Sequence, residues 1–174
     1  AALAAMGYVV LLVDLDAQGN ATMGCGVDKQ QLDVSVYDVL MGKAHIDEAT
    51  TRVQENGFDL VPGNADLTAV QVELIGRIGR ERVLSDALTS IQESYDFILI
   101  DCPPALNVLT LNALVAAHSI LIPMQCEYDT IVPRNVRLAE APSHGLSIMK
   151  YDRSSKGGLA YSALADEIVR RNQN

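Results

Sequence analysis

Tryptophan is absent from the 174-residue sequence, aromatic residues make up only 5% of it, and cysteine occurs three times. Cys25, Cys102 and Cys126 have neither C-x-x-C nor Cys/His spacing, so the sequence predicts no disulfide framework and no zinc site, and it favours a reducing compartment. No apolar run approaches the roughly 20 residues of a membrane-spanning helix, and the first residues do not resemble a cleavable export signal. We therefore expect a cytoplasmic protein without membrane contact.

Aliphatic residues are abundant instead, and 49% of the chain is hydrophobic. A high share of Val, Ile and Leu with few aromatics is typical of parallel strands that helices bury on both faces. The length suits one domain with a substantial core. The sequence therefore predicts a single α/β domain over residues 1–174, with a doubly wound, mostly parallel sheet.

The order of the expected elements supports this fold class. Helical stretches at about 66–77 and 81–94 lie between expected strands, and a last helix at about 156–171 has Tyr161, Leu164, Ala165 and Ile168 as its buried stripe. The expected strands of the sheet cover residues 8–15, 57–61, 96–101 and 119–124.

One connection does not fit a parallel sheet. The segment "SILIPMQ" is followed, after only "CEYD", by "TIVP", which also has the pattern of a strand. Parallel neighbours need a crossover of about a dozen residues or more. Either these two strands form an antiparallel hairpin, or a crossover is missing near residues 128–130.

The charge of the chain is unevenly distributed. The net charge is −9, but residues 1–130 contain 6 Lys and Arg against 18 Asp and Glu, whereas residues 131–174 contain 7 against 4. A basic segment beside an acidic one can mark a surface for a polyanion, or it can be the solvated face of ordinary helices. Both interpretations stay open on charge alone.

Two aspartates follow the apolar run in "VVLLVDLDAQGNAT", residues 9–22. Alternate residues of a strand point to the same side, so Asp14 and Asp16 leave the strand facing the same way. Like charges so placed repel each other. We therefore expect a metal ion, a lysine or a helix N-terminus near them.

A third aspartate ends the apolar strand in "YDFILIDCPP". Ligands of open α/β sheets bind beyond the carboxyl ends of the strands, where Asp101 could hold a hydrated magnesium ion beside a nucleotide. Taken alone, a strand-end aspartate more often forms a turn or caps a helix. The two strands together would bring Asp14, Asp16 and Asp101 to one edge of the sheet.

Three blocks of the sequence resemble one protein family, and they occur in the family's order. They are "VLLVDLDAQGNAT", "YDFILIDCPPALNVLTLNALVAAHSILIPMQCEY" and "IVPRNVRLAEAPSHGLSIMKYDRSSKGGLAY". Together they resemble the ParA/Soj branch of the deviant Walker A ATPases, which segregate chromosomes and plasmids. The resemblance covers nearly the whole chain.

This resemblance implies ATP and Mg²⁺ as cofactors. By match, Asp16 positions the attacking water and Asp101 is the Walker B residue that holds magnesium. Asp14 is either a supporting carboxylate or a strand-end charge that a neighbour neutralises. The residues implied at the adenine are Pro133, Arg134 and Asn135.

The resemblance also implies homodimers that sandwich ATP, nonspecific DNA binding, association with the nucleoid and regulation by a ParB-like partner. On charge and resemblance together, we expect Arg170 and Arg171 to contact DNA.

Two departures from the family pattern accompany these matches. A phosphate loop of the form KGGVGKT is expected before residue 1 and does not occur in the sequence. Relatives also carry further helices and a strand between "CEY" and "TIVPRN", so the chain has the pattern of a truncated and internally shortened protein.

Two alternative functions stay open. One is a noncatalytic remnant or interaction module of the same family. The other is a Rossmann-type dinucleotide-binding protein with Asp14 on a ribose hydroxyl.

Overall fold

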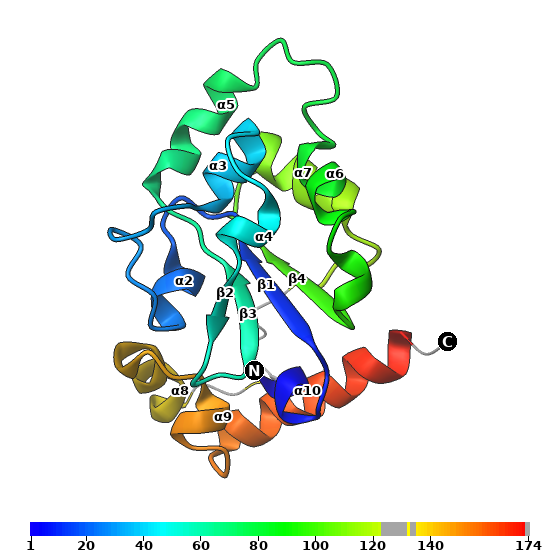
Figure 1. Ribbon diagram of the computed structural model, residues 1–174. Coiled ribbons are helices and arrows are strands. Elements are labelled where there is room, and N and C mark those ends of the chain that lie inside the picture. Colours follow the sequence, from blue (N-terminus) through cyan, green and yellow to red (C-terminus); the bar gives the residue numbers. More distant parts are fainter. Residues whose placement is uncertain (123–131, 133–134, 173–174) are drawn as a thin grey trace.

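The computed structural model describes residues 1–122, 132 and 135–172, which form a central sheet with helices around it (Figure 1). The four strands are β1 (Val10–Asp14), β2 (Thr51–Val53), β3 (Phe58–Val61) and β4 (Phe97–Asp101), in the order β2-β3-β1-β4. β1 is parallel to β3 and to β4, whereas the short β2 is antiparallel to β3. The predicted mostly parallel α/β sheet is confirmed.

The helices are short, apart from α7 and α10. Those before β4 are α1 (Ala2–Ala5), α2 (Asn20–Gly24), α3 (Val36–Met41), α4 (Ile46–Ala49), η1 (Ala65–Ala69), α5 (Val70–Glu73), α6 (Val83–Leu88) and η2 (Gln92–Ser94). Those after β4 are α7 (Val108–Ala116), α8 (Val136–Glu140), η3 (Ala141–His144), α9 (Ile148–Tyr151) and α10 (Lys156–Asn172).

Both faces of the sheet are buried, because successive side chains of a strand point to opposite faces. Leu11 and Val13 of β1 belong to a core that α3, α6 and α7 cover. Val10 belongs to a second core, which includes Leu3 of α1 and Ala165 of α10. Helices therefore pack on both faces, as predicted, and β1 is the best buried strand.

The predicted strand at 119–124 is wrong over its described part, because residues 119–122 contain no strand. Ile120, Leu121 and Ile122 are exposed. An apolar run becomes a strand only where it meets a partner for its hydrogen bonds, and these residues pair with no other described strand. Within the described residues β4 is consequently an edge strand. Residues 123 and 124, the junction at 128–130 and most of "TIVP" lie outside the described part.

Two helix predictions also need correction. The stretch predicted as a helix at 66–77 is a 3-10 turn followed by one turn of α-helix, since Gly76 and Gly79 adopt positive φ angles that break the helical path. In α10 the predicted stripe is only partly buried: Ala165 is buried, but Tyr161 is exposed. The helix itself and its position were predicted correctly.

Candidate functional site

The carboxyl ends of β1 and β4 bring aspartates to one edge of the sheet. Asp14 ends β1 and Asp101 ends β4, and these two residues are register partners across the parallel pair. The next backbone N–H, that of Leu15, donates to the Asp101 carbonyl oxygen at 2.9 Å. Asp16 follows in the loop directly after β1. This edge is where open α/β sheets bind ligands.

Asp14 is completely buried and is held by hydrogen bonds. Its Oδ2 accepts from the Thr22 N–H at 2.8 Å and from the Thr22 hydroxyl at 2.7 Å, and its Oδ1 accepts from the Asp16 N–H at 3.1 Å. These donors satisfy the buried carboxylate. Asp14 therefore fixes the loop that carries Asp16, and it is not available to a ribose hydroxyl, which removes the basis of the dinucleotide alternative.

Thr22 extends this network to the turn after β3. Its hydroxyl oxygen accepts from the Gly63 N–H at 2.9 Å. A Cβ on Gly63 would lie 2.4 Å from the Asp14 carbonyl oxygen, so only glycine fits this close approach. The sequence interpretation named neither Thr22 nor Gly63. The available signals were a threonine eight residues after Asp14 and the Pro-Gly turn of "VPGN".

Asp16 is half-buried in a tight turn. Its Oδ1 accepts from the Gln18 N–H at 2.9 Å, and its carbonyl oxygen accepts from the Gly19 N–H at 2.8 Å. The ammonium group of Lys29 donates to the Gln18 carbonyl oxygen. Lys29 therefore contacts the backbone of this turn, and no ion pair among the described residues joins it to Asp14 or Asp16. The helix end that contacts Asp14 is the short α2, through the Thr22 N–H.

Asp101 is in contact with solvent, but its environment disfavours a negative charge on its carboxyl group. Partial burial raises the pKa of Asp101 above its ordinary value, the negative charges of Asp14 and Asp16 raise this pKa further, and a hydrogen bond from the Cys102 N–H lowers it. Burial and the two neighbouring negative charges therefore make the ionised form of Asp101 less favourable than that of a free carboxyl group in water, and a cation at this edge would relieve that cost. The edge is suited to binding a positively charged group.

Magnesium matches this set of donors only in part. Carboxylate oxygens are ligands that Mg²⁺ prefers, and Mg²⁺ usually takes one or two of them together with water and phosphate oxygens. Within the described residues no group of three Asp, Glu, His or Cys side chains converges as a metal site. Asp101 could thus serve as one ligand of a metal that a nucleotide also holds.

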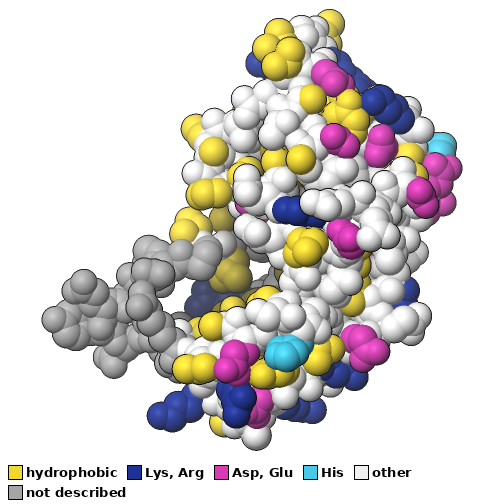
Figure 2. Space-filling view, turned by 90° about the vertical axis from the view of Figure 1, so that its left-hand side faces the viewer, with side chains coloured by type: hydrophobic (Ala, Val, Ile, Leu, Met, Phe, Trp, Pro, Cys, Tyr) yellow, Lys and Arg dark blue, Asp and Glu magenta, His cyan; other side chains and the backbone are white. Residues whose placement is uncertain are grey.

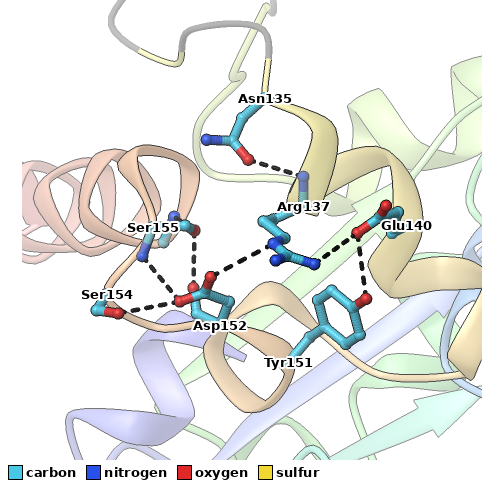
Figure 3. Close-up of polar contacts among 8 residues, drawn as sticks. Asn135, Arg137, Glu140, Tyr151, Asp152, Ser154 and Ser155 are labelled. Carbon is cyan, nitrogen blue, oxygen red and sulfur yellow. Dashed lines mark hydrogen bonds and ion pairs between the residues drawn. The ribbon is translucent and has the colours of Figure 1, made fainter.

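Of the residues implied at the adenine, the structure describes only Asn135, which does not join this cluster. Pro133 and Arg134 lie outside the described residues. Asn135 caps α8, where its side-chain oxygen accepts from the Arg137 N–H at 2.8 Å (Figure 3). Figure 1 places α8 at the opposite end of the sheet from the carboxyl ends of β1 and β4. The adenine role of these residues stays a prediction.

Arg137 forms the centre of a polar network beside Asn135. It contacts Glu140 at 3.1 Å and Asp152 at 3.8 Å, and the Tyr151 hydroxyl donates to the same Glu140 carboxylate (Figure 3). This network joins α8 to α9 and to the start of α10. Its acidic partners offset the charge of Arg137, which makes it a structural residue.

Arg170 and Arg171 lie near the end of α10, and both contact Glu167. Arg171 Nε is 2.6 Å from Glu167 Oε1, and Arg170 contacts the other carboxylate oxygen. Both arginines remain largely exposed. Hydrogen bonds from Arg171 and then Arg170 lower the pKa of Glu167. The two arginines are thus accessible but partly neutralised.

A mostly parallel sheet with helices on both faces and aspartates at the carboxyl ends of adjacent strands is a doubly wound α/β arrangement, and the match to solved structures makes it the P-loop NTPase fold class. Comparison with known proteins agrees. Residues 1–132 match the family model described as "AAA domain". Within the described residues, no helix has the length and apolar character to cross a membrane.

Relatives in sequence define the family more closely. The sporulation initiation inhibitor protein Soj of Bacillus subtilis is 35% identical over 97% of this chain and 89% of its own length. The chromosome partitioning protein ParA of Caulobacter vibrioides is 34% identical over 99% of this chain and 87% of its own. The chain belongs to the ParA/Soj family of chromosome partitioning proteins, within the MinD/ParA superfamily.

Solved structures give the same fold. A cobyrinic acid a,c-diamide synthase from Mycobacterium smegmatis, with bound ADP and magnesium, matches with a TM-score of 0.82 and 33% identity over 99% of this chain and 86% of its own. The cell division ATPase MinD of Pyrococcus furiosus matches with a TM-score of 0.76 and 25% identity over 97% of this chain and 89% of its own.

Proposed function

We propose that this protein is a ParA-like ATPase that partitions chromosomes or plasmids by coupling ATP hydrolysis to dimerisation and nonspecific DNA binding. Relatives named as partitioning proteins and a solved neighbour that holds ADP and magnesium support this proposal. The observation that carries it is the pairing of Asp14 with Asp101 at the carboxyl edge, with Asp16 in the adjoining turn. A ParB-like partner and a cytoplasmic, nucleoid-associated location belong to the same proposal.

The aspartates take different parts in this reaction. Magnesium, when bound, neutralises phosphate charge in phosphoryl transfer. Asp101 holds a water or oxygen of the metal shell, and Asp16 accepts a hydrogen bond from the attacking water. Asp14 and Thr22 keep the Asp16 turn in place through the hydrogen bonds described above. The raised pKa of Asp101 is consistent with a carboxylate whose negative charge a bound cation would stabilise.

Phosphate binding needs a further element. The 174 residues contain no lysine- and glycine-rich phosphate loop, and a cluster of carboxylates repels phosphate. The alignment with Soj spans 226 positions against 174 residues here, which supports the proposed internal shortening of this single domain. We propose that these residues alone hydrolyse ATP negligibly and that a KGGVGKT-type loop with its strand, fused before residue 1 together with a restored crossover, gives an active enzyme.

The experiment that tests this function uses the restored protein. Asp16→Ala should leave ATP affinity largely unchanged and lower the hydrolysis rate by about 100-fold or more, since Asp16 orients the water and does not hold the nucleotide. Asp33→Ala, which removes an exposed carboxylate elsewhere, is the matched control. Loss of ATP binding with unchanged turnover per bound nucleotide would instead make Asp16 a structural residue.

A further inference from the structure

A groove of about 330 Å³ lies between α5 and the start of α7. None of its lining residues takes part in the hydrogen bonds that hold Asp14 and Asp16. Its lining is mainly apolar and consists of Gln71, Val72, Ile75, Arg80, Asn107, Val108 and Leu111. Val108 and Leu111 belong to α7, whose first turn the Asn107 side chain caps. The wall formed by α7 is therefore fixed, and the opposite wall is α5 with the loop that follows it.

Large apolar side chains surround this groove without cover. The exposed fraction is 72% for Val72 and 69% for Ile75, which line the groove, and 100% for Ile78, which lies in the loop that follows α5. Figure 2 shows hydrophobic side chains close to Lys and Arg side chains at the top of the molecule, the end where Figure 1 places α5 and the following loop. Single exposed apolar residues are ordinary, but a cluster at a concave site marks a binding surface.

Basic residues cluster in the sequence beside this groove, although residues 1–130 are acidic overall. Arg77, Arg80 and Arg82 fall within six positions and are half of the six Lys and Arg residues in the otherwise acidic segment 1–130. All three are exposed. No ion pair among the described residues involves Arg80 or Arg82. Arg80 lines the groove, Arg77 and Arg82 lie close to it in sequence, and Glu73 and Glu81 are the exposed acidic residues of the same stretch.

We propose that this groove binds an amphipathic helix of a partner protein, with an apolar stripe in the groove and Asp or Glu side chains on Arg80 and Arg82. Helix-in-groove recognition uses apolar residues at i, i+3, i+4 and i+7, and flanking carboxylates match these two arginines. A two-fold contact between copies through the groove would bring their two arginine clusters together, and the repulsion between these like charges argues against a second copy as the occupant. This inference does not depend on nucleotide binding.

The test uses synthetic peptides and the full chain. A labelled peptide of about 18 residues, long enough to form a helix, carries Leu at i, i+3, i+4 and i+7 with Glu elsewhere on its surface, and a second peptide has Lys for every Glu. Fluorescence anisotropy should show binding of the acidic peptide that weakens with salt and at least about tenfold weaker binding of the basic peptide. Equal affinities would overturn the proposal.

Variants locate the binding surface. Ile75→Ser with Ile78→Ser should weaken binding of the acidic peptide about tenfold or more, because these side chains lose apolar burial, and Arg80→Glu with Arg82→Glu should do the same through repulsion. Leu159→Ser and Arg153→Glu, which change exposed residues of the C-terminal part, are the matched controls and should leave the affinity unchanged. Circular dichroism verifies that each variant folds.

Other occupants give different results. Binding to phosphatidylglycerol vesicles that Ile78→Ser removes, without any preference for the acidic peptide, would make this a lipid-binding surface. Self-association in sedimentation that the same substitution removes would make the occupant a second copy of the chain. Either result would overturn the proposal.

Discussion

At the scale of single residues, the geometry of the carboxyl edge depends on a few buried hydrogen bonds. Asp14 and Thr22 lie beneath the Asp16 turn and link it to Gly63 after β3. The sequence predicted where Asp14, Asp16 and Asp101 would lie, because strand alternation and parallel order are local rules. It could not predict that Asp14 is a buried anchor, since two of its three donors belong to Thr22, eight residues away, and Thr22 is itself held by the distant Gly63 N–H, with no local pattern that signals either contact.

Removing the anchor should destabilise the fold. Asp14→Ala leaves the Thr22 N–H and hydroxyl without their buried acceptor, so we expect the free energy of unfolding to fall by about 2–4 kcal/mol in urea denaturation. Thr22→Val preserves the shape and should cost about 1–2 kcal/mol through the Gly63 N–H. The exposed control Asp33→Ala should stay within about 0.5 kcal/mol. An effect of Asp14→Ala as small as that of the control would contradict this account.

Removing the charge of Asp101 should stabilise the fold, in contrast to the loss of Asp14. The pKa of Asp101 is raised in the folded state, so the unfolded state releases this proton at lower pH and the folded state loses stability as pH rises from the ordinary carboxyl pKa to the raised one. Asp101→Asn should therefore increase the melting temperature at pH 7, and this gain should shrink as the pH is lowered toward 4. A melting temperature that falls in the variant at pH 7 would show that the Asp101 charge stabilises the fold.

At the scale of elements, prediction succeeded where a segment is bounded by its own signals. β1, β3, β4 and α10 follow from aliphatic runs, helical spacing and turn residues. Ile120, Leu121 and Ile122 have an equally good strand pattern, but a strand also needs a neighbour, which a local pattern does not supply. Likewise, the loop between α5 and α6 depends on the φ angles of Gly76 and Gly79.

The end of α10 tests the DNA-binding proposal. Arg170→Ala with Arg171→Ala in the restored protein should weaken DNA binding and reduce the salt slope by about 0.9 per lost phosphate contact, equally for all base sequences. Lys43→Ala with Arg52→Ala removes the same charge from the acidic part and is the control. ATP affinity should be unchanged. An unchanged salt slope in the arginine variant would exclude this helix end from the DNA surface.

Glu167 gives a complementary test of the same helix. Its hydrogen bonds with Arg171 and Arg170 hold its pKa low, so it stays ionised and competes with phosphate at neutral pH. Glu167→Gln should therefore strengthen DNA binding about two- to fivefold, consistent with the small free energies of exposed ion pairs. Filter binding at several salt concentrations measures the change. Weaker binding in this variant would indicate that Glu167 positions the arginines for DNA.

At the scale of the whole molecule, two cores hold the sheet between helices, and the carboxyl edge of that sheet collects the aspartates. The family places this architecture among partitioning ATPases, and the groove beside α7 is a separate surface for a partner. In the reaction that we propose, these 174 residues would supply the magnesium and water-positioning carboxylates, and phosphate binding would need a loop of the KGGVGKT form, which does not occur among them.

The most direct measurement of this central claim is isothermal titration of ATP, with and without Mg²⁺, into the 174-residue chain, the restored protein and its Asp101→Asn variant. We expect no micromolar binding to the 174-residue chain, magnesium-dependent binding to the restored protein and loss of that magnesium dependence in Asp101→Asn. Micromolar, magnesium-dependent binding by the 174-residue chain would contradict the requirement for a phosphate loop, and an unchanged magnesium dependence in Asp101→Asn would contradict the assignment of the carboxyl edge as the magnesium-nucleotide site.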